Sequence, residues 1–461
     1  MPTHYDAAVI GTGQAGPSLA NRLSQTGMKV AVVERKYLGG TCVNNGCMPT
    51  KTLVASAYAA RIAARAEDYG VALNAGFRID MAKVKARKDA VVLAARSGLE
   101  TWLTAMPGCT ILRGHARFIS PHDIEIGSER LSADKVFINV GGRALVPPIP
   151  GLDQVDYFTN VSIMDIDFVP KHLLILGGSY IGLEFAQVYR RFGSEVTVIE
   201  AAPRLVARED DDISAAIKEI LENEGIKFHL ATKCSGLAKR GSEIVAQLDG
   251  PAGRCEVGGT HLLLAIGRKP NTDDLGLEAA GVKLDPRGYV VTDEYLCTNV
   301  PHIWALGDCN GRGAFTHTSF NDYQIVAANV LDHAHRRVTE RIATYALFID
   351  PPLGRIGMTE HEARQTGRRV LIGKRPMTRV SRAVEKGETQ GFMKILVDQD
   401  TGKILGAAIL GTSGDEAIHC ITDTMYADAP YSTLQHAVHI HPTVSEFIPT
   451  VLGELTALSS S

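Results

Sequence analysis

YDAAVIGTGQAG, residues 5–16, places a short apolar run directly before glycines at the spacing G-x-G-x-x-G. The run predicts a buried β-strand, and the residues after it have the pattern of an amphipathic helix. Residues 28–33 predict a second strand, which ends on Glu34. In this context the glycines allow a tight turn against a pyrophosphate, and the acid binds a ribose hydroxyl. The stretch therefore predicts a Rossmann-like dinucleotide-binding unit whose glycines are Gly11, Gly13 and Gly16.

The same arrangement recurs further along the chain. HLLIL at 172–176 predicts a strand, GGSYIG at 177–182 a turn, and EVTVI at 195–199 a second strand that ends on Glu200. Ser179 replaces the middle glycine, and so small a residue still lets a pyrophosphate approach. Two such units predict two bound dinucleotides with electrons passing between them. A duplicated fold with one inactive site is the alternative.

Between these units lies GGTCVNNGCMPTK, residues 39–51, in which four residues separate two cysteines. A thiolate attacks disulfides and a thiol does not, so a redox pair needs close spacing and nearby positive charge. Cys42 and Cys47 have that spacing, and Lys51 supplies the charge. Structural thiols and half of a zinc site are the alternatives, but zinc needs a second ligand pair and the other cysteines are scattered singly. The pattern favours a redox-active pair.

The segment at 39–51 resembles the redox-disulfide segment of the class I pyridine nucleotide-disulfide oxidoreductases, flavoproteins that include glutathione reductase, dihydrolipoamide dehydrogenase and mercuric reductase. The resemblance extends over essentially the whole chain. It implies an α/β fold with two Rossmann-like dinucleotide-binding domains and a C-terminal α+β dimerisation domain. The implied domains are a discontinuous FAD-binding domain at 1–150 and 270–340, an NAD(P)-binding domain at 151–269 and a dimerisation domain at 341–461.

The resemblance also implies two cofactors, FAD in the first unit and a nicotinamide nucleotide in the second. Glu200 favours NADH, because a carboxylate binds a 2′-hydroxyl and repels a 2′-phosphate. Arg204 and Arg208 lie just downstream and keep NADPH possible. Tyr180 matches the aromatic residue that covers the nicotinamide pocket in several relatives. The other positions implied to bind a cofactor are Gly40, Thr41, Lys51, His115, Ala116, Gly142, Gly177, Ser179, Ile181, Gly182, Gly267, Asp308 and Thr316.

Four residues are implied to handle the electrons. In relatives the first cysteine attacks the substrate and the second contacts the flavin, which makes Cys42 the interchange thiol and Cys47 the charge-transfer thiol. Glu184 matches the acid that pairs with the lysine at Lys51 beside the flavin, an ion pair expected to adjust the electronics of both cofactors.

HIHPTVSE, residues 439–446, is implied to handle protons. An imidazole shuttles protons near neutral pH, and a carboxylate fixes its tautomer. His441 matches the family's general acid/base and Glu446 its orienting acid, whereas His439 is expected to be structural. In relatives this histidine reaches the cysteines of the other subunit. The resemblance therefore implies a homodimer whose active site is shared between subunits.

Composition limits the partners. The chain has 48 basic and 51 acidic residues, a formal charge of −3, and no long run of either sign, so we expect neither nucleic acid nor a membrane as a partner. No apolar stretch approaches the ~18 residues of a spanning helix. The N-terminus has no targeting leader, which predicts a cytoplasmic protein, and no resident metal is expected.

These observations predict an FAD-dependent oxidoreductase that passes electrons from NAD(P)H through the flavin and Cys42–Cys47 to a small-molecule disulfide. A dihydrolipoamide dehydrogenase, which takes a dithiol in the opposite direction, and a mercuric or other metal-ion reductase are alternatives within the enzyme class. A flavin-bound redox sensor is the non-enzyme alternative. Mercuric reductases end in a vicinal cysteine pair, whereas residues 454–461 read ELTALSSS, which favours a disulfide substrate.

Overall fold

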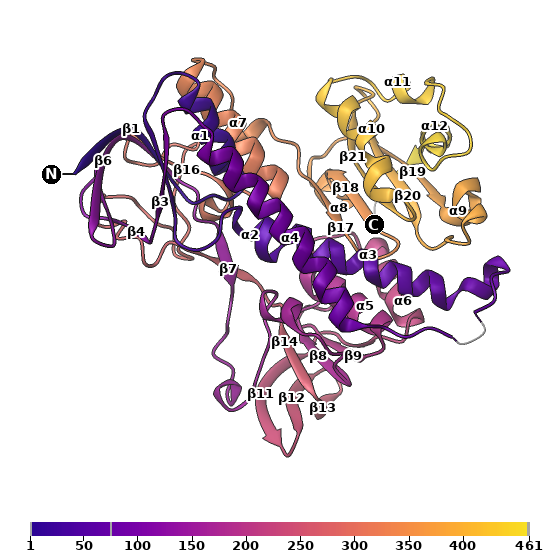
Figure 1. Ribbon diagram of the computed structural model, residues 1–461. Helices are drawn as coiled ribbons and strands as arrows, with labels where there is room; N and C mark the ends of the chain where they lie inside the picture. Colours follow the sequence, from indigo (N-terminus) through magenta and orange to yellow (C-terminus); the bar gives the residue numbers. More distant parts are fainter. Residues whose placement is uncertain (1, 74–75, 459–461) are drawn as a thin grey trace.

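The structure, a computed structural model, describes residues 2–73 and 76–458. Ser459–Ser461, part of the C-terminal stretch without cysteines, lie outside the described residues. The structure has three bodies (Figure 1), and residues from all three line one cavity. The first comprises residues 2–144, 74–75 excepted, with 268–340; the second comprises 145–267; and the third comprises 341–458. The predicted α/β fold class is confirmed.

The first body is built on a mainly parallel sheet in the order β3-β2-β1-β6-β5-β4, with β16 also paired to β6. Both faces of β2 and of the second half of β1 are buried, which explains why Ala7–Ile10 and Val30–Val33 are unbroken apolar runs. Helices α1 and α7 lie side by side against the sheet (Figure 1). The elements are β1 (Thr3–Ile10), α1 (Ala15–Ser24), β2 (Val30–Glu34), β3 (Cys109–Arg113), β4 (Ala116–Phe118), β5 (Asp123–Ile126), β6 (Glu129–Ile138), β16 (Ile303–Ala305), η4 (Gly307–Asn310), α7 (Thr316–Leu331) and η5 (Val338–Glu340).

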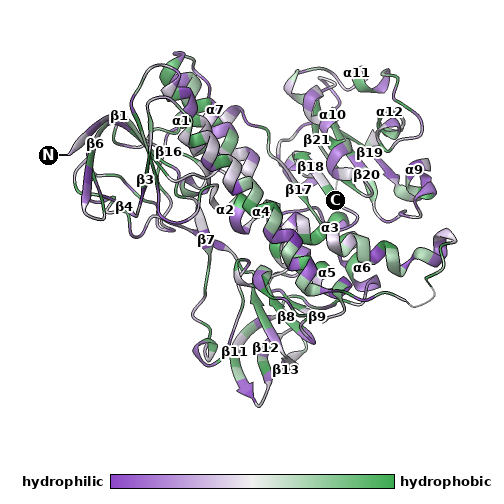
Figure 2. Ribbon diagram, in the orientation of Figure 1, coloured by the Kyte–Doolittle hydropathy of each residue, from purple (hydrophilic) through white to green (hydrophobic). Residues whose placement is uncertain are grey.

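Long helices connect the first body to the other two. α2 (Gly40–Asn45) is followed by α3 (Cys47–Ala64), η1 (Ala66–Tyr69) and α4 (Met81–Thr104). Hydrophilic and hydrophobic residues are mixed along α4 (Figure 2), and few of its residues are buried. This agrees with a largely solvated helix. Among the described residues, no helix has both the length and the apolar composition needed to cross a membrane.

The second body contains a parallel sheet in the order β10-β9-β8-β14, beside an antiparallel sheet β11-β12-β13. The antiparallel pair β7 and β15 joins it to the first body, where the chain leaves and returns. The connecting strands are β7 (Gly142–Ala144) and β15 (Arg268–Pro270). The elements of the second body are η2 (Leu152–Gln154), η3 (Ser162–Asp165), β8 (His172–Leu176), α5 (Tyr180–Phe192), β9 (Glu195–Ile199), α6 (Asp211–Asn223), β10 (Lys227–His229), β11 (Lys233–Arg240), β12 (Glu243–Gly250), β13 (Gly253–Gly259) and β14 (His261–Leu264).

The third body is an antiparallel sheet in the order β17-β18-β21-β20-β19-β22, in which β20 and β21 form an antiparallel pair. Helices cover the sheet in Figure 1. The elements are β17 (Thr344–Leu347), β18 (Leu353–Gly357), α8 (Glu360–Gln365), β19 (Val370–Pro376), η6 (Met377–Arg379), α9 (Ser381–Glu385), β20 (Phe392–Asp398), β21 (Ile404–Leu410), α10 (Gly414–Tyr426), α11 (Ser432–Gln435), η7 (Ser445–Phe447), α12 (Ile448–Gly453) and β22 (Thr456–Ala457).

A buried ammonium fixes the second body against the third. Lys394 Nζ, on β20, lies 2.8 Å from Asp210, 2.8 Å from Asp212 and 2.7 Å from Glu360. The lysine side chain is 1% exposed. Removing one partner from such a group leaves an uncompensated buried charge, so the cluster ties the start of α6 to the third body.

Candidate functional site

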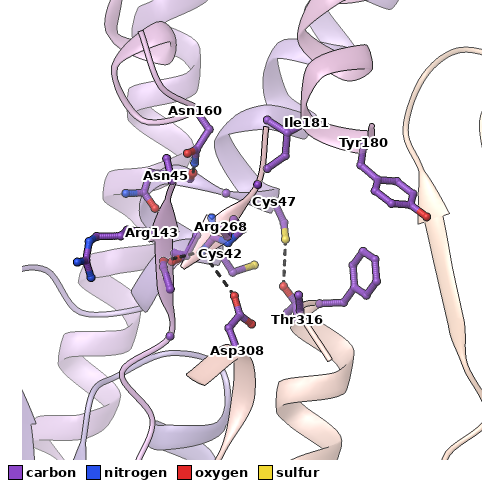
Figure 3. Close-up of a pocket in the computed structure, with 18 of the residues that line it drawn as sticks. Cys42, Asn45, Cys47, Arg143, Asn160, Tyr180, Ile181, Arg268, Asp308 and Thr316 are labelled. Atoms are coloured by element: carbon purple, nitrogen blue, oxygen red, sulfur yellow. Dashed lines mark hydrogen bonds and ion pairs between the residues drawn. The ribbon is translucent and has the colours of Figure 1, made fainter. Parts of the chain in front are cut away.

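A cavity of about 1680 Å³ opens where the three bodies meet, and both cysteines of the predicted redox pair line it (Figure 3). Both glycine-rich turns face it as well. The predicted residues that line the cavity are Gly11, Gly13, Glu34, Gly40, Thr41, Cys42, Cys47, Lys51, His115, Ala116, Gly142, Gly177, Ser179, Tyr180, Ile181, Glu184, Glu200, Gly267, Asp308 and Thr316. The structure therefore brings residues from most of the sequence together around one cavity.

The first turn is closed so tightly that only glycine fits. A Cβ on Gly11, whose φ is +101°, would lie 2.3 Å from the carbonyl oxygen of Asn139. Glu34, at the end of β2, accepts hydrogen bonds from the backbone N–H of Thr12 at 3.1 Å and from its hydroxyl at 2.6 Å. The turn leads into the N-terminus of α1, where backbone N–H groups and the helix dipole favour an anion. These features fit the pyrophosphate and ribose of a dinucleotide.

The second turn repeats this construction. A Cβ on Gly177 would lie 2.4 Å from the carbonyl oxygen of Ala265. Glu200, at the end of β9, accepts from the N–H of Gly178 at 2.6 Å. Ser179 adopts an extended conformation immediately before α5. The residues present therefore fit a second dinucleotide.

The last glycine of each turn was expected to bind a cofactor, but it does not line the cavity. Gly16 and Gly182 lie outside the set of residues that line the cavity. A Cβ on Gly16 would lie 2.3 Å from the oxygen of Gly11, and a Cβ on Gly182 would lie 2.0 Å from the oxygen of Gly177. Their role is close helix–strand packing, which supports the cofactor turns from behind.

The two arginines after β9 are not equivalent. Arg204 donates to the Asp211 carboxylate and, at 3.1 Å, to the carbonyl of Ala207. It does not line the cavity, so the expectation that Arg204 reaches a phosphate is not supported by its position. Arg208 does line the cavity, together with Lys233, which sequence reasoning missed. Lys233 is the first residue of β11, and no motif marks it.

A glycine break brings the two cysteines together. α2 ends before Gly46 and α3 begins at Cys47. A Cβ on Gly46 would lie 2.8 Å from the carbonyl oxygen of Thr41, so the break requires glycine. Both Cys42 and Cys47 are free thiols, and Cys47 Sγ lies 3.0 Å from the hydroxyl oxygen of Thr316 (Figure 3).

The environment assigns different protonation states to the two thiols. The pKa of Cys47 is lowered to about 6, first by the hydrogen bond from Cys42 and then by the Thr316 hydroxyl and the Lys51 charge, while burial opposes the shift. The same hydrogen bond, burial and the charge on Cys47 raise the pKa of Cys42 far above its usual value. Near neutral pH, Cys47 is therefore the thiolate and Cys42 the thiol.

Lys51 forms the predicted ion pair with Glu184. Lys51 Nζ lies 2.7 Å from Glu184 Oε2, and the glutamate side chain is 6% exposed. Glu184 Oε1 accepts from the backbone N–H of Phe348 at 3.1 Å. One carboxylate of the second body thus contacts a residue of the first body and a residue of the third.

Asp308 follows β16 at the edge of the cavity. Burial raises the pKa of its carboxyl, and the charge of Arg268, 3.5 Å away, acts in the opposite direction (Figure 3). Arg268 also donates to the carbonyl of Gly142 at 2.6 Å. Sequence reasoning missed Arg268, although it directly follows the predicted Gly267 in a turn after a buried strand.

The predicted proton-handling pair lies outside the cavity lining. His441 Nδ1 is 2.8 Å from Glu446 Oε2, and the histidine side chain is 73% exposed. Nearby Val438 and Ile440 are 99% and 80% exposed. Within one subunit the structure joins His441 to Glu446 but does not bring either to the cysteines.

The fold and the site together define a flavin- and pyridine-nucleotide-dependent disulfide oxidoreductase. Residues 5–324 match the family described as pyridine nucleotide-disulphide oxidoreductase, and residues 343–452 match the dimerisation domain of that family. The chain belongs to this family, whose members bind FAD and take electrons from NAD(P)H. The predictions of family, enzyme class and these cofactors are confirmed, and the dimerisation domain supports a homodimer.

Similar proteins cover nearly the whole chain. It is 35% identical over 450 residues to the probable pyridine nucleotide-disulfide oxidoreductase RclA of Escherichia coli strain K12, covering 96% of this chain and 97% of that protein. It is 36% identical over 460 residues to a mercuric reductase of Streptomyces lividans, covering 99% and 97%. It is 33% identical over 446 residues to a dihydrolipoyl dehydrogenase of Thermus scotoductus, covering 96% and 95%.

Solved structures give the same result. The HOCl-induced flavoprotein disulfide reductase RclA from Escherichia coli matches with a TM-score of 0.89 at 34% identity, covering 98% of this chain and 100% of that one. A Cu(II) complex of the same protein matches with a TM-score of 0.89 at 34% identity, covering 97% and 99%.

The unequal thiols predict a specific pH dependence. In the reduced protein, alkylation of Cys47 by iodoacetamide should be fast above pH about 6 and slow as the pH falls through that value, because only the thiolate reacts. Cys42→Ala removes the donor to Cys47 and should move the midpoint to higher pH. Mass spectrometry of the peptide that contains Cys47 measures the rate. The same midpoint with and without Cys42 would contradict this assignment.

Proposed function

We propose that this chain reduces small-molecule disulfides with electrons from NADH, at a site completed by a second subunit. The observation that carries the proposal is the thiolate–thiol pair at Cys47 and Cys42, placed in the cavity that both dinucleotide turns face. Bound FAD would carry two electrons from the nicotinamide to the Cys42–Cys47 disulfide and convert it to this dithiol state.

The proposed chemistry uses Cys42 as the attacking thiol. After losing its proton, Cys42 attacks one sulfur of the substrate disulfide, which forms a mixed disulfide and releases the first product thiolate. The Cys47 thiolate then attacks the Cys42 sulfur, which releases the second product thiolate and leaves the Cys42–Cys47 disulfide. Two electrons leave the dithiol, and each product thiolate takes up one proton.

A base is needed because Cys42 holds its proton. The raised pKa of Cys42 means that the attacking thiol is not self-activated near neutral pH. His441, oriented by Glu446, is the proposed acceptor of this proton and the donor to the product thiolates. Its exposure, and that of the apolar residues before it, supports delivery of this pair to the partner subunit's cysteines.

Metal-ion reduction is the competing substrate class, since relatives include mercuric reductases and a Cu(II) complex of RclA. The pair formed by His441 and Glu446 favours the disulfide, because disulfide exchange must move protons at each sulfur. A soft ion held by Cys42 and Cys47 would form a stable dithiolate and stall turnover.

A substrate panel tests this proposal. We expect NADH oxidation to continue with at least one organic disulfide among glutathione disulfide, lipoamide and other low-molecular disulfides, and to stall with Hg(II) at low micromolar concentration. Cu(II) is assayed in parallel, and absorbance at 340 nm follows the turnover. Sustained oxidation with a metal ion and none with any disulfide would make metal reduction the better assignment. A single reduction by NADH with no turnover would instead indicate a redox sensor.

The position of Glu200 predicts a coenzyme preference. NADH should exceed NADPH in kcat/KM, and Glu200→Ala should narrow the gap by about 1–3 kcal/mol, the size of one hydrogen bond to a charged group. Arg208→Ala is the matched variant, since Arg208 is the arginine that lines the cavity. A wild-type preference for NADPH that disappears in Arg208→Ala would overturn the assignment to NADH.

The shared site predicts complementation between inactive subunits. His441→Ala should lower disulfide turnover by roughly 10²–10⁴, the contribution of a general acid/base, while reduction of the enzyme by NADH stays nearly intact. Glu446→Gln should lower it less, because the proton carrier remains. Heterodimers of Cys42→Ser and His441→Ala subunits should regain part of the activity, since one of their two sites is complete. Verified heterodimers that stay inactive would argue against a site shared in this way.

A further inference from the structure

Three polar side chains in contact with one another lie behind Tyr180, between the second and third bodies. Tyr345, on β17, donates its hydroxyl hydrogen to Glu209 Oε1. Glu209 Oε2 lies 3.8 Å from Nη1 of Arg355, on β18. Glu209 and Arg355 are each only 1% exposed. The sequence alone indicated no role for Tyr345, Glu209 or Arg355.

Packing alone does not explain this arrangement. Among the described residues, Glu209 Oε2 and the Nε and Nη2 atoms of Arg355 have no hydrogen-bond partner. Burial raises the pKa of Glu209, with the Arg355 charge acting against it. In proteins, apolar side chains of similar volume often stabilise a buried junction at least as well as an ion pair does. Buried polar groups that stay unpaired in a native protein call for another reason, such as a function.

The free side of Tyr345 faces the cavity. Its ring meets the Tyr180 ring edge-on, with centroids 5.6 Å apart and planes at 80°. Phe315 completes the group, with ring centroids 5.9 Å from Tyr180 and 5.8 Å from Tyr345. All three rings line the cavity. Tyr180, labelled in Figure 3, is the first residue of α5 and directly follows the second turn.

We propose that Tyr345 is a positioning residue: anchored by Glu209 and Arg355, it holds the Tyr180 ring as a wall of the nicotinamide pocket. This inference rests on the proposed function, which places the pyridine nucleotide at the second turn with Tyr180 over its nicotinamide. Tyr345 and Arg355 both belong to the third body. The dimerisation domain therefore takes part in shaping the pocket for the electron donor.

The test compares two ligands that differ only in the nicotinamide. NAD⁺ and ADP-ribose share the part that binds along the second turn, but ADP-ribose has no ring for Tyr180 to contact. We expect Tyr345→Phe to raise the ratio of Kd for NAD⁺ to Kd for ADP-ribose by roughly 2- to 10-fold, the effect of one net hydrogen bond. Glu209→Gln should raise it in the same direction, and the double variant no further. Isothermal titration of the oxidised, FAD-loaded protein measures both constants.

Tyr58→Phe is the matched control. The Tyr58 hydroxyl donates to a carboxylate oxygen of Glu388 at 2.7 Å, also across a junction with the third body, but Tyr58 does not line the large cavity. The Tyr58→Phe protein loses the same kind of hydrogen bond, but at a position outside the large cavity. Its ratio of Kd for NAD⁺ to Kd for ADP-ribose should therefore stay at the wild-type value. Thermal denaturation of every variant confirms that a folded protein is titrated. A Tyr345→Phe protein that binds ADP-ribose normally and keeps or lowers the wild-type ratio overturns the proposal.

Tyr180→Ala separates this proposal from the function on which it rests. If Tyr180→Ala raises the ratio and Tyr345→Phe does not, the link from Tyr345 to Tyr180 is wrong and the nicotinamide pocket stands. If Tyr180→Ala leaves the ratio unchanged, the assignment of the nicotinamide pocket fails, and the role of Tyr345 fails with it.

Discussion

The carboxylate of Glu184 is the contact that relates the three bodies to one another. It projects from α5 of the second body, pairs with Lys51 on α3 and accepts from the backbone of Phe348 in the third. A buried carboxylate needs partners, and here each partner comes from a different part of the chain. The requirement to satisfy one buried charge thus helps to set the positions of the cysteine helix, the second dinucleotide turn and the dimerisation sheet.

Much of the fold could be predicted because its strongest constraints are local. The two turns need glycines where Gly11 and Gly177 nearly touch a neighbouring strand, and such contacts leave a pattern readable in any chain. The strands at 172–176 and 195–199 end where the sequence indicates, since an apolar run meets glycine or an acid there. Gly16 and Gly182 lie in the predicted turns, but each packs against the first glycine of its turn and does not line the cavity.

The remainder of the site depends on contacts between distant segments. Arg204 pairs with Asp211 instead of facing the cavity, and a sequence cannot show which of two nearby arginines turns inward. Glu209 and Tyr345 are 136 residues apart and belong to no motif. The pairing of His441 with Glu446 was implied by the resemblance to the family, but the separation of this pair from the cysteines within one subunit is seen only in the fold. Residues that act through tertiary packing leave no periodic trace.

Cys47 is the first residue of α3, a helix that packs into the apolar core. Leu53 and Ala57 of α3 are buried in the same apolar cluster as Leu183 of α5 and Leu347 of β17. The N-terminus of α3, where Cys47 stands, is therefore fixed by packing against both other bodies, and its dipole favours the thiolate. Disulfide exchange needs reacting sulfurs in line within a narrow range of distances, so a rigid support suits this chemistry better than a mobile one. Packing in the apolar core thus determines where the reactive sulfur of Cys47 lies in the polar site.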